Sequence, residues 1–216
     1  MKLKTVYDIC NKYKWIPNED LWGMDYRHIL ILHNILLLPS FVRTLEIGTH
    51  YGLSTTAFIE ANYLRSNKLE IHLCDINFEY SAKMLCQRDS NVQFHEMKSS
   101  EYLSNAPKFD FALLDGSHIA EDVEDEFEYL CLNGIDTLML HDVNTQLLHE
   151  NKETPWFDGP MFLKQKLVSS PDWLCLEDSL YRTGEKTERG LFFATTQKNI
   201  YDEVLKIFEY FRNYEL

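Results

Sequence analysis

One segment determines the architecture of this chain, Leu45-Glu46-Ile47-Gly48-Thr49-His50-Tyr51-Gly52-Leu53-Ser54-Thr55-Thr56. It ends an apolar run with an acid, continues with two glycines in a turn, and places hydroxyl side chains where a helix would begin. Glycine permits a sharp bend and a close approach of a ligand to the backbone. The free N–H groups of the helix start, with Ser54 or Thr55 as a cap, can receive a carboxylate. The segment therefore predicts the strand–loop–helix site of a nucleotide-like cofactor.

The loop lacks the features of phosphate-binding loops. No G-x-x-x-x-G-K-[ST] pattern is present, and His50 and Tyr51 stand where a dinucleotide loop carries a glycine and a small residue. Glu46 would repel a phosphate, but it can accept a hydrogen bond from an ammonium group or a hydroxyl. Pyrophosphate binding is therefore disfavoured.

The pattern Glu46-x-Gly48-x-x-x-Gly52 resembles motif I of the class I S-adenosylmethionine-dependent methyltransferases. Their cofactor carries an amino acid moiety and a ribose but no phosphate. The resemblance assigns Glu46, Gly48 and Thr49 to the methionine part of the cofactor. The helix start at Ser54 is expected to help with its carboxylate.

A second expected strand, residues 69–75, alternates apolar side chains and ends in Asp75. An acid at this position can accept hydrogen bonds from both hydroxyls of a ribose. We expect this role because the position of Asp75 relative to Gly48 is the one that the fold requires. An N-cap of the following segment is the structural alternative.

A third expected strand, residues 91–97, leads into Lys98-Ser99-Ser100. In the resembled family the loop after this strand contacts the adenine, often through an acid followed by a small hydroxyl residue. Here Lys98 stands in place of that acid. Ser99 is expected to contact the adenine through its side chain or backbone, and a helix cap is the alternative left open.

Two further strands end in polar motifs. Residues 109–114 lead to Asp115-Gly116-Ser117-His118, and residues 136–140 lead to His141-Asp142-Val143-Asn144. Together these motifs resemble one branch of the class I methyltransferases, the O-methyltransferases and sugar- or antibiotic-tailoring enzymes, which often hold a divalent cation. The resemblance covers about residues 40 to 196. The cofactor-binding residues expected from the whole set are Glu46, Gly48, Thr49, His50, Gly52, Ser54, Asp75, Ser99 and Asp115.

The expected catalytic residues are Asp115, His118, His141 and Asp142. Two carboxylates at adjacent strand ends repel each other unless a cation or a proton lies between them. Mg²⁺ held by Asp115 and Asp142 would bind a hydroxyl and lower its pKa, with His118 or His141 as the base. Related metal-using enzymes commonly carry an acid where His141 stands, and histidine is a poorer ligand for Mg²⁺. A metal-free site and a purely structural cluster therefore stay open, and we predict that both aspartates are required for turnover with or without metal.

Composition limits the function. The chain has 216 residues, of which 45% are hydrophobic and 25% charged, as in one soluble domain. A formal net charge of −13 argues against a nucleic acid partner, because phosphate binding needs a basic face. The apolar residues 29–38 are too short to span a membrane, and the amino terminus lacks the layout of a signal peptide. Five cysteines without C-x-x-C spacing predict free thiols in a cytoplasmic protein, with Cys74 and Cys131 buried.

The order of elements predicts an α/β fold with a doubly wound, mostly parallel seven-stranded sheet. Residues 1–38 are expected to form an N-terminal helical cap, and residues 39–216 a single S-adenosylmethionine-binding methyltransferase domain. Strands near 173–181 and 190–196 are expected to form a closing antiparallel hairpin. One edge of the sheet should gather Glu46, Asp75, Ser99, Asp115 and Asp142 into a cleft.

Two helices carry further expectations. The acidic run Glu121–Glu128 is interpreted as the solvated face of a surface helix and not as a metal site. The last helix, with apolar side chains between residues 200 and 211, is expected to pack on the sheet or on a partner, so a homo-oligomer stays open.

The resemblance implies methyl transfer from S-adenosylmethionine to a small molecule, a sugar or secondary metabolite, at a hydroxyl oxygen. The N-P-P-[YF] signature of amino-group methylation in nucleic acids is absent, since residues 115–118 occupy its place. Two rival interpretations remain. A nucleotide-sugar or dinucleotide enzyme lacks its phosphate fingerprint here. A catalytically inactive binding or assembly module is kept open by His50 and Lys98.

Overall fold

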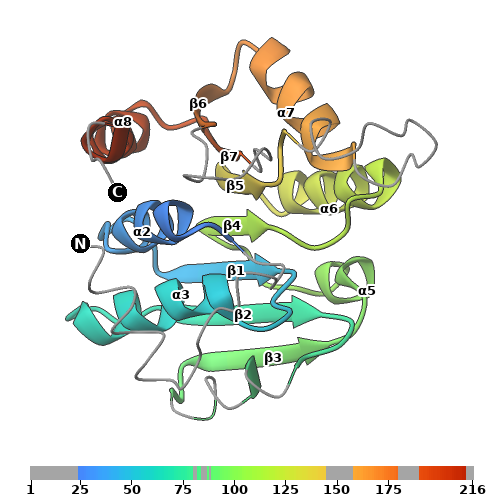
Figure 1. Cartoon of the computed structure of the whole chain (residues 1–216). Coiled ribbons are helices and arrows are strands. Elements are labelled where there is room, and N and C mark those ends of the chain that lie inside the picture. Colours follow the sequence, from blue (N-terminus) through green and yellow to red (C-terminus); the bar gives the residue numbers. More distant parts are fainter. Residues whose placement is uncertain are drawn as a thin grey trace.

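The computed structural model describes residues 24–79, 82–83, 87, 89–144, 158–179 and 190–212. Its centre is a seven-stranded sheet in the order β3-β2-β1-β4-β5-β7-β6 (Figure 1). Residues 1–23 of the expected N-terminal cap and the turn of the closing hairpin lie outside the described residues. The strands are β1 Arg43–Ile47, β2 Glu70–Asp75, β3 Val92–Glu96, β4 Phe111–Leu114, β5 Thr137–His141, β6 Leu174–Asp178 and β7 Leu191–Thr195.

Five strands run parallel and two close the sheet in the opposite sense. β1 pairs in parallel with β2 and β4, and the outer strands β3 and β5 continue this direction. β7 pairs antiparallel with both β5 and β6. Ile47 is level with Cys74 on one side and with Leu114 on the other, so the carboxyl ends of the central strands meet at one edge. The predicted fold is confirmed, including the antiparallel ending.

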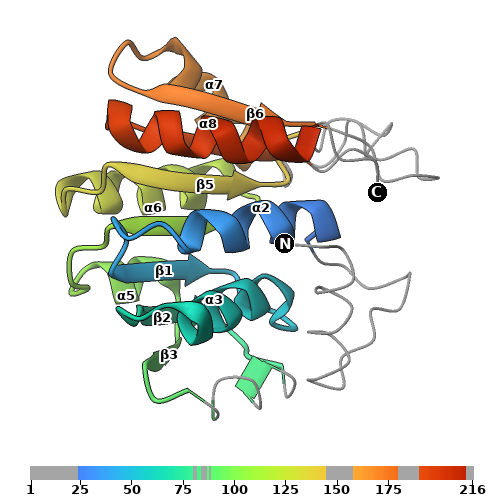
Figure 2. The same ribbon diagram turned by 90° about the vertical axis from the view of Figure 1, so that its left-hand side faces the viewer.

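Helices cover both faces of the sheet, which explains why its central strands are apolar on both sides. The helices α2, α3 and α8 lie on one face, where α2 contacts the other two, and Figure 2 looks onto this face. The helices α5, α6 and α7 pack on the other face. Their bounds are α2 Tyr26–Leu36, α3 Leu53–Leu64, α5 Ser99–Leu103, α6 Ala120–Leu132, α7 Gly159–Ser169 and α8 Lys198–Arg212.

The described part of the expected N-terminal cap is α2, which packs into the main core. Leu30, Ile31 and Leu32 are fully buried in the same apolar cluster as Phe58 and Phe208. The helix ends at Leu36, two residues before the expected end. The division at residue 38 stays a prediction.

Three local predictions were wrong. The helix α3 begins at Leu53 with Gly52 as its N-cap, so neither Ser54 nor Thr55 caps it. The acidic run on α6 is a solvated face as expected except at Glu126, which is only 2% exposed. Cys131 is exposed, whereas Cys74 is buried as expected. In each case the error came from side-chain direction, which a linear pattern does not specify.

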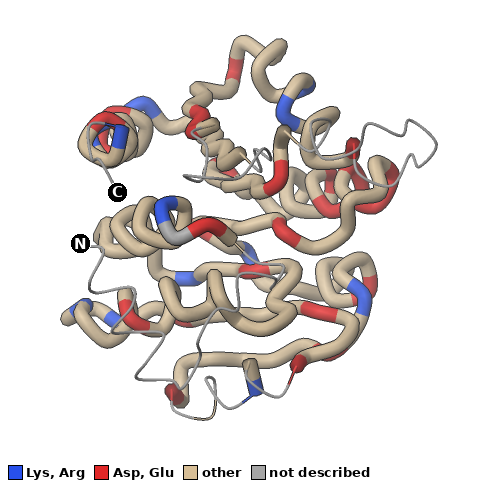
Figure 3. Tube along the Cα trace, in the orientation of Figure 1, with Lys and Arg blue, Asp and Glu red and all other residues tan. Residues whose placement is uncertain are grey.

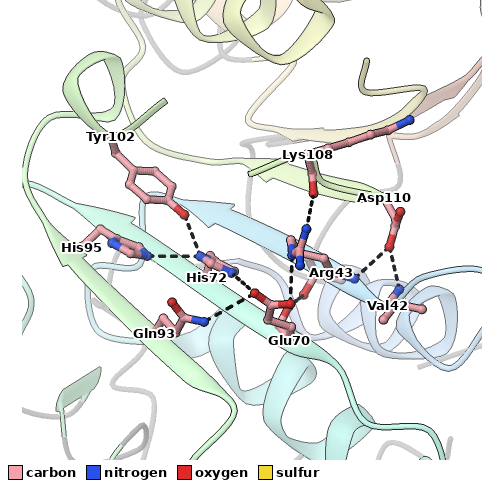
Figure 4. A network of polar contacts seen from close by, with 10 residues as sticks. Val42, Arg43, Glu70, His72, Gln93, His95, Tyr102, Lys108 and Asp110 are labelled. Atoms are coloured by element: carbon pink, nitrogen blue, oxygen red, sulfur yellow. Dashed lines mark hydrogen bonds and ion pairs between the residues drawn. The ribbon is translucent and has the colours of Figure 1, made fainter. Parts of the chain in front are cut away.

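A polar network ties the β1, β2 and β3 strands to α5 (Figure 4). His72 contacts Glu70 through Nε2 at 2.9 Å, and its Nδ1 lies 3.2 Å from His95 and 2.6 Å from the Tyr102 hydroxyl. Glu70 also accepts a hydrogen bond from Arg43 at 2.9 Å. These contacts hold β2 and β3 in register beneath the edge.

Among the described helices, none is both long enough and apolar enough to cross a membrane.

Candidate active site

A cavity of about 910 Å³ opens at the carboxyl edge of the parallel strands. It is the place where the sequence predicted a cleft, and it collects side chains from segments far apart in the chain. Of the predicted site residues, neither Glu46 nor Gly52 lines it. Those that do are Gly48, Thr49, His50, Ser54, Asp75, Ser99, Asp115, His118, His141 and Asp142.

The loop after β1 depends on glycine at position 48. Gly48 has a φ of 87°, in the left-handed region, and a Cβ there would lie 2.1 Å from the carbonyl oxygen of Asp115. The loops after β1 and β4 therefore touch each other across this residue. No other amino acid satisfies both the dihedral angle and the space. The absence of a side chain leaves the backbone of this loop open to the cavity.

Glu46 lies behind the loop instead of facing the cavity. Its side chain is fully buried, and it accepts hydrogen bonds from the hydroxyls of Ser54 and Thr55, the latter at 2.6 Å. Burial raises the pKa of Glu46 to about 8, although the two hydroxyl hydrogen bonds lower it and nearby Asp115 and Asp75 add to the rise. Glu46 thus joins β1 to the first turn of α3 and shapes the loop from behind.

Asp75 ends β2 with both carboxylate oxygens held by backbone donors. The N–H of His50 donates to Oδ2 at 2.8 Å, and the N–H of Asn77 donates to Oδ1 at 3.1 Å. His50 has a φ of 45°, so this contact is made by a strained residue. Asp75 remains on the cavity wall with acceptor capacity to spare, because each oxygen has two lone pairs.

The hydroxyl of Thr49 is buried without a hydrogen-bond partner among the described residues, yet Thr49 lines the cavity. A buried hydroxyl without a partner is unfavourable. A polar group bound beside the Gly48 loop would satisfy it. This observation fits a ligand with polar atoms at the loop, such as the amino acid part of the predicted cofactor.

His141 lies between two carboxylates. Its Nδ1 is 3.1 Å from Asp115 and 3.4 Å from Asp142, and its Nε2 is 3.2 Å from Nδ1 of His28 on α2. Burial opposes a charge on the ring, but Asp115 and Asp142 raise the pKa of His141 to about 9. An imidazolium here relieves the repulsion between the two aspartates, which are the nearest charged neighbours.

His118 completes this cluster from the loop after β4. Its Nε2 lies 3.6 Å from Asp142, and its side chain is 22% exposed, against 1% for His141. Asp142 has a φ of 55°, which is unusual for a residue other than glycine. One ligand atom each from Asp115, His118 and Asp142 lies within 4.8 Å of the others, close enough to hold one metal ion. The predicted catalytic residues are thus brought together.

The β3 side of the cavity contains the predicted residue Ser99 and three acidic residues of α6 that sequence reasoning missed. Ser99, the first residue of α5, donates its hydroxyl to Oε1 of Glu126 at 2.5 Å and does not cap the helix. Asp122 and Asp125 of α6 line the same wall. A signal existed for Glu126, because it lies three residues after Val123 and four before Leu130, on the apolar stripe of the helix.

Carboxylates are the most numerous ionisable groups on the described wall of the cavity. Acidic positions gather at the strand ends and along α6 (Figure 3). The carboxylate residues on the wall are Asp75, Asp115, Asp122, Asp125, Glu126 and Asp142, and among the described lining residues Lys98 is the one lysine or arginine. Such a wall attracts cations and repels anions.

Comparison with known proteins shows which families and solved structures this chain resembles. Residues 45–132 match a family model described as a methyltransferase domain. The chain is similar to the O-methyltransferase TomG from Streptomyces achromogenes, involved in tomaymycin synthesis and solved in complex with SAM. That match has a TM-score of 0.66 and 17% identity, over 89% of this chain and 88% of that chain. No curated protein matches the sequence.

Two further solved structures share the fold. An O-methyltransferase from Bacillus cereus in complex with SAH matches with a TM-score of 0.61 and 18% identity, over 90% of each chain. An SAH-bound methyltransferase from Podospora anserina matches with a TM-score of 0.60 and 15% identity, over 89% of this chain and 88% of that chain.

The sheet order, the glycine loop after β1 and the edge cavity define a Rossmann-like methyltransferase fold. With the methyltransferase-domain match of residues 45–132 added, the chain shares the fold of S-adenosylmethionine-dependent methyltransferases.

Proposed function

We propose that the protein transfers the methyl group of S-adenosylmethionine to a hydroxyl oxygen of a small molecule. One observation carries the proposal. A single cavity joins the Gly48 loop and Asp75 on one side to the Asp115, His118 and Asp142 cluster on the other. The first part suits a cofactor with an amino acid and a ribose, and the second suits an acceptor hydroxyl.

The residues of the cofactor side have separable tasks. The backbone of Gly48 and the hydroxyl of Thr49 would contact the amino acid part, and Asp75 would accept hydrogen bonds from the ribose hydroxyls. When bound, the cofactor supplies an activated methyl group on a sulfonium. The task of the protein is then to hold that methyl in line with the acceptor oxygen.

His118 is the better placed base of the two histidines. Both ring nitrogens of His141 lie near other side chains, Asp115 and His28, and its ring is nearly inaccessible. His118 is more exposed on the cavity wall and lies beside Asp142, which would stabilise the protonated ring. Asp115 and Asp142 would also hold Mg²⁺ if it binds, and the metal would lower the pKa of the hydroxyl.

The acceptor is expected to be neutral or cationic, because the acidic wall of the described cavity disfavours phosphates and carboxylates. Sugars and hydroxylated secondary metabolites meet this condition. A catalytically inactive binding module gains no support from the site, since the residues proposed here for transfer lie close together. Cofactor binding without turnover on any acceptor would favour that alternative.

A methyl-transfer assay tests the proposal. Labelled S-adenosylmethionine is combined with a panel of neutral hydroxyl compounds, with and without Mg²⁺ and a chelator. Asp115→Ala and Asp142→Ala should each reduce kcat by about 100-fold or more while the protein still folds and binds cofactor. Asp172→Ala, in an exposed turn, is the matched control and should keep the wild-type rate. Wild-type rates in both aspartate variants would show that the cluster is structural, and activity that survives chelation would exclude only the metal.

A further inference from the structure

The contacts expected for the methionine and ribose parts of the cofactor leave one side of the cavity without an assigned ligand group. Gly48 follows β1 and Asp75 ends the neighbouring β2, so a cofactor that runs from the first to the second continues toward β3. On that side the wall carries apolar side chains that are open to solvent. Ile76 is 74% exposed, Met97 36% and Ile119 37%. Exposed apolar side chains at a cavity suit the faces of a flat ring such as a purine.

Glu126 lies in the same wall with one oxygen unused. Its Oε1 accepts from Ser99, whereas Oε2 is buried with no hydrogen-bond partner among the described residues. Burial raises the pKa of Glu126 to about 7, with the Ser99 hydrogen bond acting against this rise and Asp122 and Asp125 adding to it. The buried Oε2 of Glu126 without a partner in the described part of the chain is unfavourable, and a hydrogen-bond donor bound in the cavity would satisfy it.

The chemistry of the purine selects this acid over its neighbours. Above pH 7 Glu126 is mostly ionised and only accepts hydrogen bonds, so it pairs with an amino group. Lys98, which stands where an acid was expected, only donates and cannot bind an amino group. Asp122 and Asp125 are exposed, so water can satisfy their oxygens, whereas Glu126 is buried. Glu126 is the acid that the hydroxyl of Ser99 holds in place beside the apolar wall.

We propose that Glu126 of α6, held by Ser99, recognises the amino group of the adenine and so makes the site specific for adenosyl over inosyl cofactors. This inference rests on the proposed function, because it assigns a further contact to the same bound cofactor. The acid that the β3 loop lacks is supplied from the next helix along the wall.

Calorimetry with two ligands tests it. S-adenosylhomocysteine carries the amino group, and S-inosylhomocysteine carries a carbonyl in its place. The wild-type protein should bind the adenosyl compound about 10- to 100-fold more tightly, as expected for one charge-assisted hydrogen bond. Glu126→Gln offers the carbonyl an N–H donor, so this preference should fall to a few-fold or reverse. Glu124→Gln makes the same change two residues away, at an exposed partner of Lys166, and should keep the wild-type ratio.

The outcomes separate the two proposals. Failure of the wild-type protein to bind S-adenosylhomocysteine would contradict the proposed function, and this inference with it. Tight binding of both ligands by the wild type, or an unchanged ratio in Glu126→Gln, would overturn this inference alone. If Glu126→Gln does not fold, Glu126→Asp takes its place. It keeps the carboxylate, so it should bind S-adenosylhomocysteine more weakly but still prefer it, and loss of that preference would contradict the role of the carboxylate.

Discussion

Glu46 and Asp75 are acids near the ends of neighbouring strands, but register gives them different roles. Glu46 is level with Leu73, two residues below the level of Asp75. It therefore lies inside the fold, where the hydroxyls of Ser54 and Thr55 bind it, while Asp75 reaches the cavity. A sequence pattern identifies an acid near a strand end but not its depth below the edge. This explains why both were predicted to contact the cofactor.

The buried carboxyl of Glu46 makes the stability of the folded protein depend on pH. In the unfolded chain Glu46 loses its proton near pH 4.5, whereas the folded protein retains it up to about pH 8. Between these values the folded state binds more protons, so this residue lowers stability as pH rises, and its effect is complete above about pH 8. Glu46→Gln should therefore gain stability relative to wild type from pH 5 to pH 8 in chemical denaturation.

An exposed glutamate changed in the same way, Glu101→Gln, provides the control for that series. Its difference from wild type should stay nearly constant with pH. A constant difference for Glu46→Gln as well would mean that the Glu46 carboxyl is ionised like an ordinary surface acid, against its position in the structure.

At the scale of elements, the end of α2 is fixed by a side chain from the end of α3. The guanidinium of Arg65 donates to the carbonyl oxygens of Leu36, Leu38 and Phe41, at 2.8, 2.5 and 2.6 Å. These carbonyls follow the last turn of α2 and have no helical N–H to bind them. Arg65 thereby joins the two helices that cover one face of the central strands.

Removal of this contact should destabilise the protein without altering its site. Arg65→Met leaves the buried carbonyls of Leu36 and Phe41 without a side-chain donor, which should cost about 2 kcal/mol or more of unfolding free energy. Arg43→Met is the matched control, because Arg43 is 38% exposed and pairs with a half-exposed Glu70. It should cost about 1 kcal/mol or less. Equal losses in the two variants, measured by denaturant unfolding, would contradict the role given to Arg65.

Elements were predictable where the pattern was long and regular. The apolar runs of β4 and β5 and the alternation of β2 marked strands within two residues of their observed ends. The start of α3 was placed wrongly because hydroxyl residues suggested a cap, while the left-handed Gly52 performs that role. Local patterns specify element type better than the direction in which a polar side chain turns.

At the scale of the whole molecule, the site is assembled from segments separated by long stretches of sequence. The sequence could indicate that Asp75, Asp115 and Asp142 end parallel strands and so share one edge. It could not indicate that His28 of α2 reaches His141, because this contact joins residues 113 positions apart. It also could not place Glu126 in the wall, since its acidic neighbours obscured the apolar spacing that identifies a buried position.

We infer that this edge cavity binds S-adenosylmethionine through the Gly48 loop and Asp75. Calorimetric titration of S-adenosylhomocysteine into the wild type, Asp75→Asn and the exposed control Asp172→Asn tests it directly. We expect one site per chain in the wild type, affinity lower by about 10- to 100-fold in Asp75→Asn, and no change in the control. Absence of binding to the folded wild type, or equal affinities for the wild type and Asp75→Asn, would contradict it.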